Sequence, residues 1–138
     1  MGEQMVSSEN LSRDLLQSLF DAAFMETEID EEGDLFVREQ GVGCFALIPE
    51  SRKHIQLMGF ATPNEDASDA ARLEFVNAVN RRYVVVRAYT NQHGRVVFDT
   101  FIPVEGGISA RSVVLATKRF LSIPGEALRA CDTANIFG

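Results

Sequence analysis

The 138-residue sequence contains no tryptophan, only two cysteines and only two histidines. Cys44 and Cys131 share no motif, and His54 and His93 lack the spacing of metal ligands. No motif places a nucleophile beside a base, so we expect no enzyme, no metal and no other cofactor. Cysteines without a partner motif are typical of free thiols in the cytoplasm, which is the expected location.

Long apolar runs and clustered basic residues are missing as well. No run approaches the roughly 18 residues that span a bilayer, and the first ten residues do not have the pattern of a signal peptide. The net charge of −7 argues against nucleic acid, because phosphate contacts need clustered lysine and arginine. Arg81, Arg82 and Arg87 form the best local basic patch. We therefore expect neither a membrane nor a nucleic acid as a partner.

Acidic residues are concentrated between Glu26 and Asp34. A calcium-binding loop between two helices needs alternating aspartates, a glycine and a closing glutamate, and "DEEGD" lacks that spacing. Glutamates that alternate along a strand face water. The acidic run is therefore interpreted as a solvated surface.

The residues that are present favour one soluble domain, with 46% hydrophobic and 24% charged residues. Residues 1–10 are polar and are expected to be flexible. The domain is expected over residues 11–123. Pro124 and Gly125 are expected to end or kink the last helix, which leaves residues 124–138 as a C-terminal tail with room for one helical turn.

Three segments have the three-and-four spacing of apolar residues that is typical of an amphipathic helix. Each of them follows a serine that can serve as the N-cap. The three helices are expected to begin at Ser12, Ser68 and Ser109 and to end near Ala23, Asn80 and Pro124.

Between these helices apolar residues alternate with a period of two, as in strands. Loops this short make the strands antiparallel neighbours. The fold class is therefore α+β, an antiparallel sheet of about six strands with three helices in the order α-β-β-β-β-α-β-β-α. The strands are expected near residues 27–29, 35–37, 43–48, 54–60, 83–90 and 96–102.

The stretch "EGGIS" joins the last strand to the last helix. Glycines that open a helix can hold a phosphate, but Glu105 would repel an anion and the lysine of a phosphate loop is absent. Gly106 and Gly107 are therefore interpreted as a corner that lets the strand reverse into the helix.

The segment "FVNAVNRRYVVVRAYTNQHGRVVFDTFIPVEGGIS", residues 75–109, resembles the YbjN-like family of small bacterial proteins, described as sensory transduction regulators. The matching features are an Asn-x-x-Asn at Asn77 and Asn80, a tyrosine-bearing strand, a hairpin with Gly94 at its tip, and the corner that ends at Ser109. The family often has an acidic residue before the hairpin glycine, where this sequence reads "NQHG". The resemblance covers about residues 10–123.

This resemblance implies a fold similar to that of the type III secretion chaperones, which are small acidic proteins that work as homodimers on client chains. It supports a non-enzymatic regulatory or chaperone-like domain that binds another protein through apolar patches and strand addition at a sheet edge. The alternative is a small-ligand sensor. An enzyme is the third hypothesis, which a cluster of Asp, His or Cys in a pocket would favour.

Asn77, Asn80, Arg87 and Tyr89 are the candidate ligand- or partner-binding residues. Another interpretation makes the asparagines structural: Asn80 ends the helix, where asparagine tolerates positive φ, and Asn77 bonds the backbone of the neighbouring strand. The strand at residues 83–90 is apolar on both sides. We therefore expect a homodimer with part of the sheet or the second helix at its interface.

Overall fold

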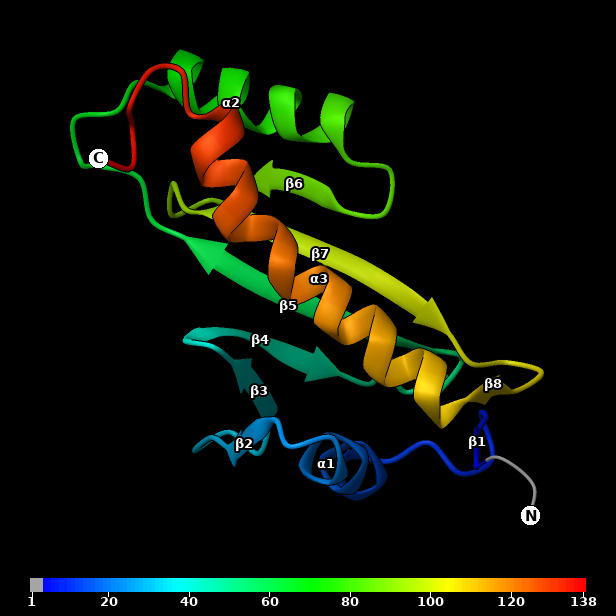
Figure 1. The fold of residues 1–138 in the computed structure, drawn as a ribbon. Coiled ribbons are helices and arrows are strands. Elements are labelled where there is room, and N and C mark those ends of the chain that lie inside the picture. The colour runs from blue at the N-terminus through cyan, green and yellow to red at the C-terminus, as the bar shows by residue number, and fades with distance from the viewer. Residues whose placement is uncertain (1–3) are drawn as a thin grey trace.

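Each helix begins beside a capping serine in the computed structural model, which describes residues 4–138 (Figure 1). The hydroxyls of Ser12, Ser68 and Ser109 accept hydrogen bonds from backbone N–H groups in the first turns that follow, as predicted. The helices are α1 (Arg13–Ala22), α2 (Asp69–Arg82) and α3 (Ala110–Cys131).

Six strands form one antiparallel sheet in the order β2-β3-β4-β5-β7-β6. They are β2 (Glu26–Ile29), β3 (Leu35–Glu39), β4 (Val42–Leu47), β5 (His54–Ala61), β6 (Arg87–Thr90) and β7 (Val96–Pro103). The predicted α+β class, the six-stranded antiparallel sheet and the three helices are confirmed. Two further strands, β1 (Met5–Val6) and β8 (Ile108–Ser109), pair with each other in a separate two-stranded sheet.

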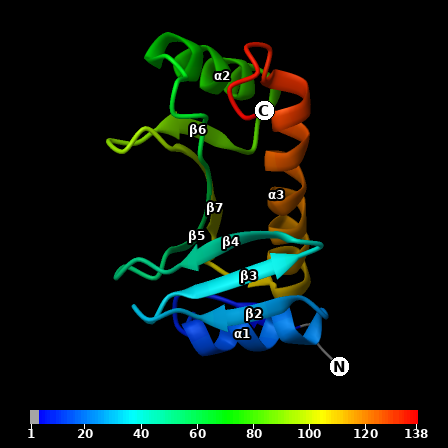
Figure 2. The same cartoon turned by 90° about the vertical axis from the view of Figure 1, so that its left-hand side faces the viewer.

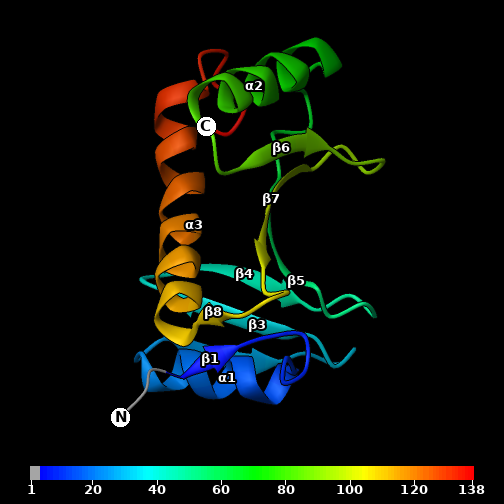
Figure 3. The same ribbon diagram turned by 90° about the vertical axis from the view of Figure 1, so that its right-hand side faces the viewer.

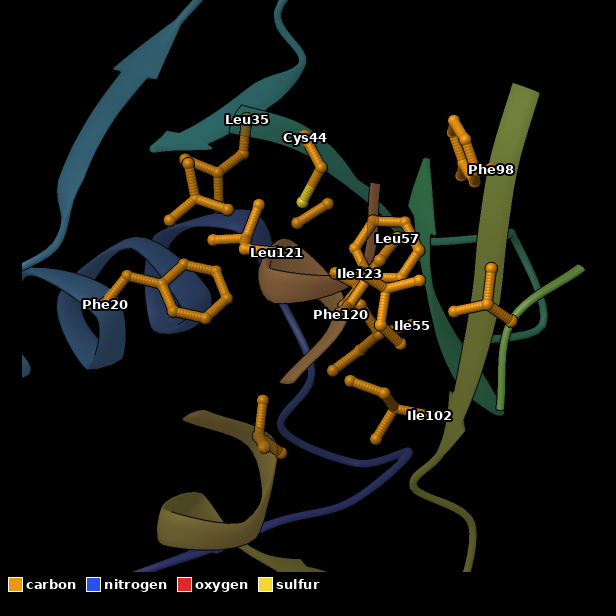
Figure 4. Packing of buried hydrophobic residues seen from close by; sticks show 14 of the residues in the cluster. Phe20, Leu35, Cys44, Ile55, Leu57, Phe98, Ile102, Phe120, Leu121 and Ile123 are labelled. Atoms are coloured by element: carbon orange, nitrogen blue, oxygen red, sulfur yellow. The ribbon is translucent and has the colours of Figure 1, made fainter. Parts of the chain in front are cut away.

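The three helices leave one face of the six-stranded sheet uncovered. α3 runs along the other face, with α1 beside β2 and β3 (Figure 2) and α2 beside β6 (Figure 3). Alternate residues of the strands point into this helical layer and are buried there, including Leu35, Leu57 and Phe98. Figure 4 shows these side chains packed with Phe20 of α1 and Phe120 of α3. The core therefore lies on one side of the sheet.

The N-terminal segment contains a short strand that its polar composition does not predict. Within residues 4–10, Met5 and Val6 pair with Ser109 and Ile108, and the Ala110 N–H donates to the Gln4 carbonyl at 2.8 Å. Val6 is fully buried. Residues 4–10, which were predicted to be flexible, therefore include a short strand whose Val6 side chain is buried in the core. Residues 1–3 lie outside the described residues.

The C-terminal segment is also part of the domain. α3 continues through Pro124 to Cys131, where a tail was predicted. A proline inside a helix removes a hydrogen bond and costs about 3 kcal/mol. The buried stripe nevertheless continues at a spacing of four through Ile123, Ala127 and Cys131, and this burial offsets the cost. The last residues fold back so that the Phe137 ring packs edge to face against Phe75 of α2, with ring centroids 4.9 Å apart.

The strand predicted at residues 83–90 begins only at Arg87. α2 extends to Arg82, two residues beyond the predicted end at Asn80, so the chain turns back towards the sheet over residues 83–86. Val84 is fully exposed and Val85 is half exposed in this turn. The expectation of a long strand that is apolar on both sides is therefore wrong for its first half.

The Gly-Gly corner has the backbone that its sequence requires. Gly106 and Gly107 have φ values of +87° and +96°, a region that residues with a side chain rarely adopt. The Gly107 N–H donates to the Val104 carbonyl at 2.8 Å and closes the turn. Glu105 lies beside Lys53, with 3.6 Å between the carboxylate and the ammonium nitrogen. These contacts are those of a turn that returns the chain to α3.

Candidate functional site

The uncovered face of the sheet is rich in aromatic side chains. Side chains alternate along a strand, and residues paired across two strands share a face, so every second residue of β3, β4, β5 and β7 points to the uncovered face. Aromatic rings are in contact between Phe36 and Phe45 (5.1 Å between centroids), Phe45 and Phe60 (6.4 Å), and His54 and Phe101 (4.6 Å). Exposed aromatic surface of this kind is enriched where proteins bind one another.

Three arginines lie over aromatic rings of this face. The guanidinium carbons of Arg38, Arg87 and Arg95 lie 5.2, 4.8 and 4.6 Å from the ring centroids of Phe36, Tyr89 and Phe60, respectively. Each contact contributes about 0.5–1 kcal/mol at an exposed site. Arginine and aromatic residues together are the side chains that dominate binding energy in protein interfaces.

A buried carboxylate lies at the end of this face that is formed by β6 and β7. Asp99 is only 2% exposed, and Arg87 donates to its two oxygens, from Nε at 2.9 Å and from Nη2 at 2.7 Å. Gln56 Nε2 donates to Asp99 Oδ2 at 3.1 Å. The hydrogen bonds to Asp99 raise the pKa of the Arg87 guanidinium. With these three bonds in place, Asp99 holds β5, β6 and β7 together instead of serving as a free base.

The four predicted site residues fall into two separate places. Arg87 and Tyr89 lie on the uncovered face, where they contact each other. Asn80 lies at the outer edge of β6: its Oδ1 accepts from the Ala88 N–H at 2.8 Å and its Nδ2 donates to the Ala88 carbonyl at 2.9 Å. Asn77 is exposed on α2. The four side chains therefore do not converge on one pocket. The backbone contact expected of Asn77 is made by Asn80, and Asn80 does not end the helix.

One edge of β7 lacks a partner strand, a feature that sequence reasoning missed. The ladder between β6 and β7 stops at Arg87 and Asp99, whereas Thr100 to Pro103 pair only with β5. Val85, next to this edge, accepts from the Thr100 hydroxyl at 2.6 Å instead of joining the ladder. Within residues 4–138, the backbone of β7 from Thr100 to Pro103 therefore has an open edge.

A groove of about 300 Å³ lies beside this open edge and is almost entirely apolar. β7 forms one wall, α3 forms the other, and the turn before β6 and the first residue of β8 complete it. Its apolar lining includes Val85, Val86, Phe101, Ile102, Ala116 and Phe120, and its only charged lining residue is Arg119. Phe101 and Val85 are 55% and 52% exposed. In the sequence, the valines at residues 84–86 were the only sign of this groove. Their alternation with neighbouring residues predicts a strand, so the turn that they form was missed.

Metal-binding clusters are absent from the part of the chain that is described. No group of three or more His, Cys, Asp or Glu side chains there has the geometry to hold a metal ion. Both cysteines are buried and free, and burial raises the pKa of the Cys44 thiol to about 12. Asp30 of the acidic run accepts from the Glu32 and Asp34 N–H groups and so closes its own turn. Among the described helices, none is long and apolar enough to cross a bilayer.

A depression of about 500 Å³ lies between the start of α2 and the β6–β7 hairpin. It is lined mainly by polar residues, including Asp69, Arg72 and His93. None of the four predicted site residues lines it. Arg72 lies 3.7 Å from the Asp69 carboxylate, so a cation and an anion already face each other there.

Comparison with known proteins identifies a relative of the whole fold. The chain matches the solved structure titled "Crystal structure of YbjN, a putative transcription regulator from E. coli" with a TM-score of 0.73 and 16% sequence identity. The match covers 91% of this chain and 92% of that one. At this identity the likeness shows a shared fold. Among curated proteins, no sequence matches the chain.

The model of the family described as "YbjN: Putative bacterial sensory transduction regulator" matches residues 12–133. That span includes the segment after Pro124, in agreement with the continuation of α3. It also includes the Asn-x-x-Asn, the hairpin and the Gly-Gly corner. The chain therefore belongs to the YbjN family of bacterial proteins.

Proposed function

We propose that this chain is a non-enzymatic regulatory domain in the cytoplasm that acts by binding another protein. The observation that carries the proposal is the apolar surface around the open edge of β7, where Val84, Val85 and Phe101 are exposed together beside the groove. Exposed apolar surface next to unpaired backbone groups favours a protein partner over a small molecule. The description of the family as a regulator agrees with such a role.

Capture of a partner by wild-type and variant baits tests this proposal. The full-length chain, Val85→Asp and Leu73→Asp are immobilised and exposed to extract from the native bacterium. Leu73 is equally exposed but lies on α2, away from the groove, and is the matched control. We expect a protein that the wild type and Leu73→Asp retain and Val85→Asp loses. Retention of nothing specific, or equal retention by all three baits, would contradict the proposal.

We propose in addition that two copies of the chain associate through the uncovered face of the sheet. Its rings and the arginines stacked on them form an aromatic surface, which suits the self-complementary contact of a two-fold dimer. Light scattering should give a dimer for the wild type and a monomer for Phe60→Glu. Leu115→Glu, on exposed α3 surface, should remain a dimer. A monomeric wild type at high micromolar concentration would refute dimerisation, and disruption by Leu73→Glu alone would place α2 at the interface.

The arrangement of the four predicted residues gives less support to the alternative of a small-ligand sensor. Such a site needs a few polar groups that converge in a pocket. Arg87 is occupied by Asp99 and Asn80 by Ala88. Arg87 and Tyr89 instead fit the uncovered face as part of a protein contact.

A further inference from the structure

We propose that the groove beside β7 receives an extended segment of a partner chain, which adds to the sheet as a strand and places a carboxylate on Arg119. This inference rests on the proposed function and specifies which kind of partner segment the groove takes. It follows from three features of the groove: the direction of its backbone groups, its apolar wall and its single charge.

The backbone direction follows from the bonds of Asn80. Because Asn80 occupies both the N–H and the C=O of Ala88, these groups point away from β7. In an antiparallel pair the residues that bond across a given edge recur every second position. Arg87 and Tyr89 therefore bond to β7 through Asp99 and Val97, their paired residues.

Continuing this repeat along β7 identifies the free groups. The next residues that face the same edge are Phe101 and Pro103. They lie beyond Arg87, the residue of β6 at which its ladder with β7 stops. Phe101 offers an N–H and a C=O, and Pro103 offers only its C=O because proline has no N–H. A bound strand therefore finds one donor and two acceptors here. Pro103 also ends the hydrogen-bonding register, so the segment that pairs is short.

The groove determines what the bound strand must contain. Side chains of an added strand alternate between the two faces of the sheet. Those on the helical side meet Ile102, Ala116 and Phe120, so they must be apolar. Those on the other side lie next to the half-exposed ring of Phe101. An alternating sequence with apolar residues at every second position satisfies both sides.

Arg119 gives the charge of the partner. It is exposed, it is the only charged lining residue, and it has no ion pair among the contacts of residues 4–138. A carboxylate at the rim of the groove complements it. A second copy of the same groove would bring another Arg119 and no free carboxylate, because no acidic residue lines the groove and Asp99 beside it is bonded to Arg87. Charge complementarity therefore favours a different chain. The occupant is therefore an extended, alternating, acid-bearing segment of another protein.

A displayed library of eight-residue peptides tests this inference. The library alternates fixed valines with random positions and is selected on the immobilised full-length chain. We expect enrichment of aspartate and glutamate at random positions. Fluorescence anisotropy then measures the Kd of a selected peptide for the wild type, for Arg119→Glu and for Arg111→Glu. Arg111 lies exposed on the same helix outside the groove, and its variant is the matched control.

Arg119→Glu should raise the Kd at least tenfold, and Arg111→Glu should leave it within twofold. Methylation of a peptide nitrogen that faces Phe101 should abolish binding, whereas methylation at the next residue should not. The inference is overturned if both variants bind equally, if no methylated position matters, or if no peptide is selected. It is also overturned if Arg119→Glu dissolves a homodimer, because the occupant is then a second copy. The capture with Val85→Asp decides separately whether the proposed function stands.

Discussion

Replacing Asn80 by alanine removes the side chain that bonds both backbone groups of Ala88 at the outer edge of β6. The two hydrogen bonds measure 2.8 and 2.9 Å, and Ala88 is buried. Each bond contributes about 1 kcal/mol, while alanine is about 0.5 kcal/mol better than asparagine inside a helix. The net loss should therefore be about 1.5 kcal/mol. It should move the urea midpoint down by roughly 1 M, with the slope of the transition unchanged.

Asn77 provides the matched control, because it lies one turn earlier on the same helix and is exposed. Asn77→Ala should leave stability unchanged or raise it by up to about 0.5 kcal/mol through helix propensity alone. Asn80→Asp keeps the acceptor but places an oxygen against the Ala88 carbonyl, so it should be at least as damaging as alanine at neutral pH. Equal urea midpoints for the Asn77 and Asn80 alanine variants would refute the conclusion that Asn80 stabilises the outer edge of β6 by bonding Ala88.

Two other measurements follow from the core and from the corner. The Cys44 thiol, whose pKa burial raises to about 12, should resist alkylation at pH 8 until the protein unfolds. Because the unfolded chain gives up this proton near pH 9 and the folded chain holds it, the free energy of unfolding should fall as pH rises above 9. Gly107→Val should cost about 1–3 kcal/mol, since φ is +96° there, whereas Arg111→Ala should shift the thermal midpoint by less than a degree or two. Rapid alkylation of folded Cys44, or a neutral Gly107→Val, would show that burial or backbone strain was misjudged.

Local signals in the sequence were sufficient for most of the fold. The three capping serines and the alternating runs between them correctly predicted three helices and six sheet strands in their order along the chain. Each of these signals depends on a few neighbouring residues and so can be recognised without knowing the tertiary contacts. The same holds for the Gly-Gly corner, where Gly106 and Gly107 both have positive φ.

The errors arose where a distant contact decides the local structure. Val6 orders the N-terminal segment by pairing with residues more than a hundred positions away. α3 continues past Pro124 because its later residues are buried against other elements. Both contacts override a local preference that pointed the other way, and neither can be read from neighbouring residues.

The sequence predicted the type of binding surface but not its location. Apolar patches and strand addition at an edge were expected, but their location was not, because the valine-rich run was assigned to a strand over its whole length. The turn over residues 83–86 depends on how far α2 extends and on the bond between Thr100 and Val85. Within residues 4–138, that turn leaves Phe101 and Pro103 without a partner strand on the β6 side, although both pair with β5 on the other side.

Hydrogen exchange of the chain, alone and bound to the protein it captures, tests the central claim most directly. If a partner strand adds at the open edge, the Phe101 amide should exchange at least tenfold more slowly in the complex. The amides of Val97 and Asp99, which already bond to β6, should change little. Slower exchange confined to α2, or no change at Phe101 in a complex that is fully formed, would contradict the claim that this domain binds its partner through the edge of β7.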